Sequence, residues 1–131
     1  MLGQYLFHVA PSSLDDRILK NGLVPKSKSV NAGIVFRHPD RVYMFTHCNI
    51  DVMKAFAKAN TRRKTYDPKS GKLVDCWEFS VFRIDFRKIR GLNLYRDSMF
   101  QNKNRKTPEA VYSEEPISPK YIEKISGFRL A

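Results

Sequence analysis

Histidine and cysteine are the first residue types to consider for chemistry, because they bind metals and supply nucleophiles in many proteins. The chain has three histidines and two cysteines, and their spacing matches neither C-x-x-C nor H-E-x-x-H. His47 and Cys48 are neighbours, and neighbouring side chains of a strand point in divergent directions. We therefore expect no metal site, and we interpret Cys48 and Cys76 as small apolar residues.

The glycine-rich loops that bind phosphates are also missing. Gly71-Lys72 lacks both the earlier glycine and the following hydroxyl residue of a P-loop, and the chain has no G-x-G-x-x-G. Three other residues remain as candidates for chemistry, namely His8, Tyr43 and Glu109. Each has a structural alternative, because His8 could be a hydrogen-bonded strand histidine, Tyr43 ordinary packing and Glu109 a solvated edge residue.

The pattern of apolar residues places these candidates in or beside the short strands of an α+β domain. Residues 5–9 predict a buried strand, and residues 14–20 predict a helix that Ser12 or Ser13 caps and Asn21-Gly22 ends. At 131 residues, the chain suits a single domain spanning residues 1–131. The other expected elements are a strand at 42–45, a helix that Asp51 caps and that runs out into 61–64, a turn at 67–71, a long strand at 73–86, a strand at 92–95, a functional loop at 96–108, a strand at 110–112, a helical turn at 118–122 and a strand at 124–130.

Positive charge is concentrated in the middle of the chain. The formal net charge is +11, and residues 54–106 hold 15 of the 24 basic residues but only five of the 13 acidic ones. Such a field attracts polyanions, nucleic acid first among them; the alternative is a lysine-rich surface without that partner. The opening residues do not resemble a secretion signal, and no stretch reaches the roughly 18 apolar residues of a membrane span. We expect a cytoplasmic protein with no membrane partner.

Three segments combine in a recognisable order. The first contains His8 and continues through residue 25, the second is 41–45 around Tyr43, and the third is 109–122, which begins at Glu109. Together they resemble the ADP-ribosyltransferase superfamily, in the His-Tyr-Glu branch that includes the poly(ADP-ribose) polymerases and the diphtheria-type toxins. The resemblance implies one small ADP-ribosyltransferase-like domain with a split, mostly antiparallel sheet and an early pair of helices.

The resemblance also implies NAD as a co-substrate in a cleft between the two halves of the sheet. Glu109 would stabilise the positive charge that develops on ribose as nicotinamide leaves, as carboxylates do in glycoside hydrolysis. His8 would hydrogen bond the adenosine ribose, and Tyr43 would face the nicotinamide ring. Val9 and Arg41, the latter through a phosphate oxygen, complete the expected cofactor site. Glu114 and Glu115 are rivals to Glu109, but they follow the strand.

The expected function is therefore an NAD-dependent mono-ADP-ribosyltransferase, as found among toxins and phage effectors, that modifies a nucleic acid or a protein. A non-catalytic nucleic-acid- or protein-binding module on the same fold is the alternative, and an RNA 2′-phosphotransferase-like activity ranks third. Six basic residues are expected to hold the nucleic acid or target: Arg62, Arg63, Lys64, Lys103, Arg105 and Lys106.

Overall fold

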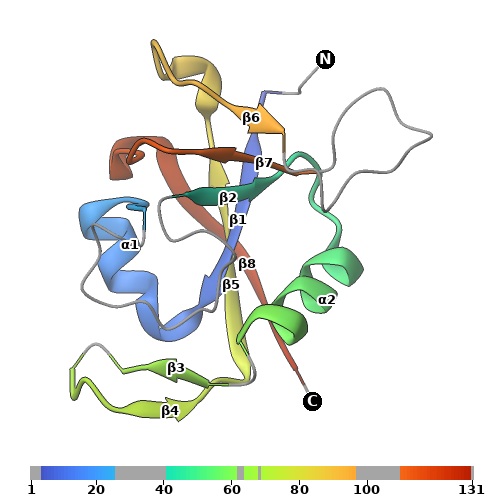
Figure 1. Cartoon of the computed structure of the whole chain (residues 1–131), viewed down its shortest axis with the longest axis vertical. Helices are drawn as coiled ribbons and strands as arrows, with labels where there is room; N and C mark the ends of the chain where they lie inside the picture. The colour runs from blue at the N-terminus through green and yellow to red at the C-terminus, as the bar shows by residue number, and fades with distance from the viewer. Residues whose placement is uncertain (1–3, 26–40, 62–63, 68, 97–109, 131) are drawn as a thin grey trace.

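The protein is a small α+β domain with two α-helices (Figure 1). The computed structural model describes residues 4–25, 41–61, 64–67, 69–96 and 110–130. Single 3-10 turns occur at Ser12–Leu14, Phe86–Lys88 and Pro119–Tyr121. The helices and strands are β1 (Leu6–Pro11), α1 (Asp15–Asn21), β2 (Val42–Phe45), α2 (Ile50–Thr61), β3 (Lys64–Tyr66), β4 (Leu73–Asp75), β5 (Glu78–Ile84), β6 (Tyr95–Arg96), β7 (Ala110–Ser113) and β8 (Ile122–Arg129).

Six strands form one sheet in the order β6-β7-β2-β1-β5-β8, while β3 and β4 form a separate hairpin. The pairings in the described part of the chain are antiparallel. β1 pairs with β5 along its whole length, but it pairs with β2 only at Phe7 and Phe45. The sheet thus consists of two three-stranded halves that meet at one residue pair. In Figure 1, β2 and β7 lie nearly horizontal, whereas β1 and β5 lie nearly vertical and β8 lies diagonally. The predicted α+β class, with a mostly antiparallel sheet and two helices, is confirmed.

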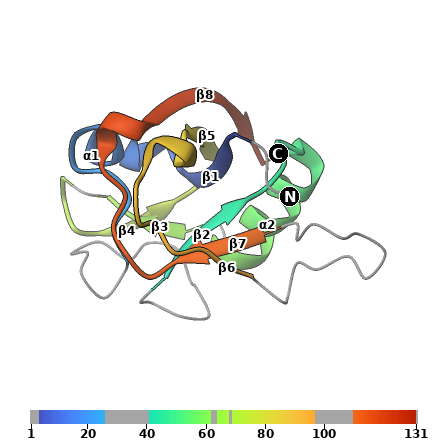
Figure 2. The ribbon, with the colours of Figure 1, turned by 90° about the horizontal axis from the view of Figure 1, so that it is seen from above.

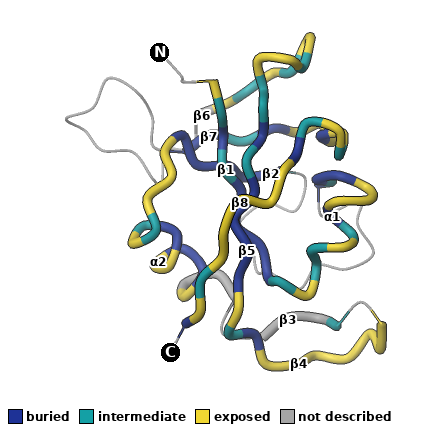
Figure 3. Tube along the Cα trace, turned by 180° about the vertical axis from the view of Figure 1, so that it is seen from behind, coloured by how far each residue is buried: buried dark blue, intermediate teal, exposed yellow. Residues whose placement is uncertain are grey.

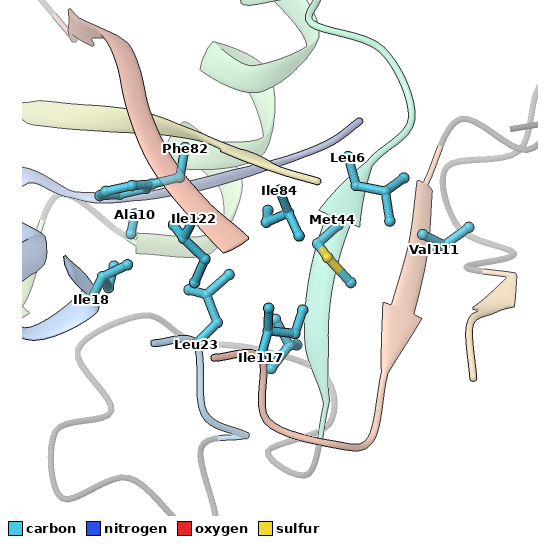
Figure 4. Packing of buried hydrophobic residues seen from close by; sticks show 11 residues of the cluster. Leu6, Ala10, Ile18, Leu23, Met44, Phe82, Ile84, Val111, Ile117 and Ile122 are labelled. Carbon is cyan, nitrogen blue, oxygen red and sulfur yellow. The ribbon is translucent and has the colours of Figure 1, made fainter. Parts of the chain in front are cut away.

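Two hydrophobic clusters hold the helices to the sheet. The first joins Ile18 of α1 to Leu6, Phe82 and Met44 of the central strands (Figure 4). The second joins α2, through residues that include Phe56, to the strands β1, β2 and β5. Figure 2, like Figure 1, places α1 and α2 on opposite sides of the domain. In Figure 3, β5 is buried at the centre and β8 is largely exposed.

The helix boundaries follow the sequence more closely than the caps do. α1 has Asp15 and Asp16 in its first turn and ends at Asn21 with Gly22 as its C-cap, which confirms the predicted stop at Asn21-Gly22 and shifts the predicted helix 14–20 by one residue. The predicted caps are wrong, since no cap side chain bonds the start of α1 and the hydroxyl of Ser12 instead contacts that of Ser80 at 3.0 Å. At α2 the side-chain oxygen of Asn49 accepts the N–H groups of Asp51 and Val52 at 3.1 and 3.3 Å, so Asn49 caps this helix.

The long strand predicted at 73–86 is wrong. The segment forms two strands, because β4 pairs with β3 in the hairpin and β5 enters the six-stranded sheet. All three residues of β4 are exposed, and the side chain of Leu73 keeps 56% of its accessible surface. The apolar residues Leu73 and Val74 of β4 are therefore exposed and are not part of a hydrophobic core. Of the strand predicted at 92–95, only Tyr95 is in a strand, the two-residue β6. The second predicted helix, expected to run out into 61–64, ends at Thr61.

Candidate functional site

The three segments that carry His8, Tyr43 and Glu109 lie in or next to neighbouring strands. β2 lies between β1 and β7 in the sheet. Phe45 pairs with Phe7 on one side and with Ala110 on the other. Glu109 lies outside the described residues, but it directly precedes Ala110, the first residue of β7. Residues far apart in the sequence are thus connected to one crossing point of the sheet.

The His8 ring makes a buried hydrogen bond at this crossing. Its Nδ1 lies 2.7 Å from the backbone oxygen of Tyr43, and the residue is only 8% exposed. A carbonyl oxygen can only accept, so Nδ1 carries the hydrogen and donates it. In the neutral ring Nε2 is then the acceptor nitrogen. The bond ties the two halves of the sheet together and gives the ring one orientation and one tautomer.

The side chain of Tyr43 points to a different neighbour. Tyr43 is 6% exposed, and the centroid of its ring lies 5.9 Å from that of Tyr112 in β7. The guanidinium of Arg41 lies over the Tyr112 ring, 4.0 Å from its centroid. Arg41 and Tyr43 therefore share one side of β2 with Tyr112. The hydrogen bond between His8 and Tyr43 joins the His8 ring to the Tyr43 backbone carbonyl.

Val9 lies in the core. It is 2% exposed, pairs with Val81 of β5 and belongs to the cluster that contains Phe45 and Met53. Its side chain therefore packs against α2 and the sheet. Any contribution of Val9 to cofactor binding depends on its backbone.

The predicted basic contacts fall mostly outside the described residues. These are Arg62, Arg63, Lys103, Arg105 and Lys106. Lys64, the sixth, begins β3 and pairs with Asp75 of β4. The hairpin turn that follows is well defined, because the backbone N–H of Lys69 and the hydroxyl of Ser70 donate to the carboxylate of Asp67. These bonds lower the pKa of Asp67. Lys69 and Lys72 are exposed at this tip.

Comparison of the chain with protein-family models, curated proteins and solved structures found no match. Among the described residues, no three His, Cys, Asp or Glu side chains form a group that could hold a metal ion. None of the helices in the described ranges combines the length and apolar character that crossing a membrane requires. In the part of the chain that the structure describes, one pocket of about 260 Å³ is lined by residues that include Cys76 and Arg129 and another by residues that include Tyr5 and Lys120; His8 lines neither.

The two cysteines differ in accessibility. Cys76 is buried, as expected of a small apolar residue, whereas Cys48 is exposed and that interpretation is wrong for it. Burial raises the pKa of the Cys76 thiol to about 11. The folded state favours the neutral thiol over the thiolate. The Cys76 thiol therefore contributes to the free energy of unfolding below its unfolded pKa, and this contribution is lost as the pH rises through about 11.

We expect a thiol reagent such as Ellman's reagent at pH 8 to label Cys48 rapidly and Cys76 only on unfolding, because the thiolate is the reactive species. The native protein should release close to one equivalent of chromophore and the denatured protein two. A Cys48→Ser variant is the control, and it should react only when denatured. Equal rates for both cysteines in the native state would contradict the burial of Cys76.

Proposed function

We propose that the protein is an NAD-dependent mono-ADP-ribosyltransferase. The observation that carries this proposal is the adjacency of β1, β2 and β7, which hold or directly follow His8, Tyr43 and Glu109. β7 runs antiparallel to β2 and Ala110 pairs with Phe45, so the chain enters β7 at the end of β2 that β1 crosses. Ala110, the residue that follows Glu109 in the sequence, thus lies at the end of β2 where Phe45 also pairs with Phe7 of β1.

The residues at the crossing fit the parts of NAD that the family resemblance assigns to them. Nδ1 of His8 donates to the Tyr43 carbonyl, so the ribose contact that the resemblance assigns to His8 would be made by Nε2. The Tyr43 ring lies beside that of Tyr112, with the two centroids 5.9 Å apart. The resemblance assigns His8 to the adenosine ribose and Tyr43 to the nicotinamide ring, which are at opposite ends of the dinucleotide. The guanidinium edge of Arg41 carries donors for a phosphate oxygen between those ends.

The proposed reaction breaks the bond between ribose and nicotinamide and forms a bond between ribose and a nucleophile of the acceptor. NAD supplies the ADP-ribose and a leaving group that departs with the bonding electrons. The role of this chain is to hold the Glu109 carboxylate where positive charge develops on the sugar. The role of His8 is to orient the ribose.

The test is transfer of label from NAD to a cell extract by the wild type and by Glu109→Gln. The substitution is expected to lower labelling by about 100- to 1,000-fold, the usual cost of removing one group that stabilises transition-state charge. Glu115→Gln is the matched control, because Glu115 is exposed beyond β7 and its backbone N–H bonds the hydroxyl of Ser113 at 3.0 Å. Glu115→Gln should label as the wild type does.

Treatment of the labelled extract with nuclease or protease identifies the acceptor class. Equal labelling by the wild type and Glu109→Gln would contradict the assigned role of the carboxylate. Failure of the wild type to bind or turn over NAD would overturn the transferase and favour a non-catalytic binding module on this fold.

A further inference from the structure

Near the β6 edge of the sheet, two side chains lie against the ring of Tyr112. Tyr95 of β6 pairs with Tyr112 of β7, and their rings are stacked with centroids 5.3 Å apart and planes 24° from parallel. The guanidinium of Arg41 lies over the same Tyr112 ring at 4.0 Å. We call Tyr95, Tyr112 and Arg41 the Tyr95 stack. Neither aromatic residue was a candidate in the sequence, because the strand register that joins them is set by the fold.

Exposure rises along this row from the core to the edge of the sheet. Tyr43 is buried at 6%, Tyr112 is half-buried and Tyr95 is 42% exposed. A lone exposed aromatic residue needs no explanation. Here, however, the exposed ring rests on a second ring that is itself fixed by the β6, β7 and β2 pairings. A ring already held in one orientation loses little conformational entropy when a flat ligand stacks on it.

We propose that the Tyr95 stack binds an unpaired base of a single-stranded nucleic acid. Bases of single strands stack on aromatic rings, whereas the bases of a duplex already stack on one another. Arg41, whose guanidinium lies over the Tyr112 ring, adds positive charge and N–H donors for a phosphate oxygen of the strand. The net charge of +11 draws a polyanion to this surface. The proposal goes beyond the transferase activity, since binding at the stack needs neither NAD nor Glu109.

The test is fluorescence anisotropy without NAD, using a labelled 12-nucleotide RNA, the DNA of the same sequence and the matching DNA duplex. We expect both single strands to bind more tightly than the duplex. Tyr95→Ala should weaken single-strand binding by about 5- to 150-fold, the range that base stacking on an aromatic ring accounts for. Tyr95→Phe should bind within about twofold of the wild type because it keeps the ring.

Tyr121→Ala is the matched control. The Lys120 ammonium lies over the Tyr121 ring, 4.9 Å from its centroid. Tyr121 itself belongs to none of the neighbouring strands β6, β7 and β2. It should bind nucleic acid as the wild type does. Tyr95→Ala should leave the slope of log affinity against log salt unchanged, because stacking releases no phosphate counterions. Circular dichroism checks that each variant is folded.

Three results would overturn the proposal: Tyr95→Ala binding like the wild type, equal losses in Tyr95→Ala and Tyr121→Ala, or equal affinity for single strand and duplex. Tyr95 is the member of the stack that the proposed NAD site does not use, so a loss of NAD binding in Tyr95→Ala equal to its loss of single-strand binding would assign the stack to the dinucleotide and would also overturn the proposal. A preference for RNA over DNA of the same sequence would support the proposal and identify RNA through its 2′-hydroxyl groups. None of these results depends on transfer of ADP-ribose, so failure here leaves the proposed reaction standing.

Discussion

Gly22→Ala is expected to destabilise the folded protein by about 3 kcal/mol or more, from backbone strain and lost hydrogen bonds together. Gly22 ends α1 with φ of 83°, a conformation that alanine adopts only with strain. A Cβ atom there would lie 2.0 Å from the backbone oxygen of Ile117. That oxygen accepts a hydrogen bond from the N–H of Leu23 at 3.0 Å, and the N–H of Ile117 donates to the backbone oxygen of Leu23 at 2.8 Å. The methyl group therefore forces this bridge apart.

The variant Gly71→Ala is the control that separates the cost of backbone strain from the cost of the steric clash with Ile117. Gly71 also has a positive φ, 70°, but no atom lies within 4 Å of a Cβ built there. Only the strain applies, so the expected cost is about 1 kcal/mol. Urea unfolding followed by circular dichroism measures both variants. If Gly22→Ala costs no more than Gly71→Ala, the Ile117 segment yields at little cost and the bridge is not the reason for the glycine.

Gly22 also illustrates what could be predicted from the sequence. An Asn-Gly pair after a short apolar-faced helix is a local signal, and α1 does end there. The strand at Val42–Phe45 has its predicted bounds for the same reason, since an apolar run between polar flanks specifies its own ends. The α+β class follows from the order of such local elements.

Features that depend on strand order and register could not be predicted. The bond from His8 to the Tyr43 carbonyl exists because β1 crosses β2, and no local pattern encodes that crossing. The stack of Tyr95 on Tyr112 needs a pairing across residues far apart in the chain. The break between β4 and β5 was missed because an exposed hairpin strand with apolar residues has the same local composition as a buried strand.

Phe45→Ala is the second large expected effect, a loss of about 3–5 kcal/mol, the usual range for a large aromatic residue removed from a core. Phe45 is 5% exposed, and its ring meets that of Phe56 edge to face, with centroids 5.3 Å apart and planes at 89°. Its backbone register joins the two halves of the sheet, with Phe7 on one side and Ala110 on the other. The cavity would therefore open beneath α2 beside the crossing of β1 and β2.

Two controls show whether the cost comes from this position. Phe45→Leu keeps most of the buried volume and should cost less than half as much, whereas Leu73→Ala, at a side chain 56% exposed, should change stability by less than about 0.5 kcal/mol. A cost for Phe45→Ala as small as that for Leu73→Ala would contradict the packing of α2 on the crossing. Domains of this size are stable by only about 5–15 kcal/mol. Phe45→Ala should therefore unfold at a much lower urea concentration than the wild type. A loss of NAD-dependent labelling under conditions in which the variant is still folded would indicate that the residues of the proposed site are displaced.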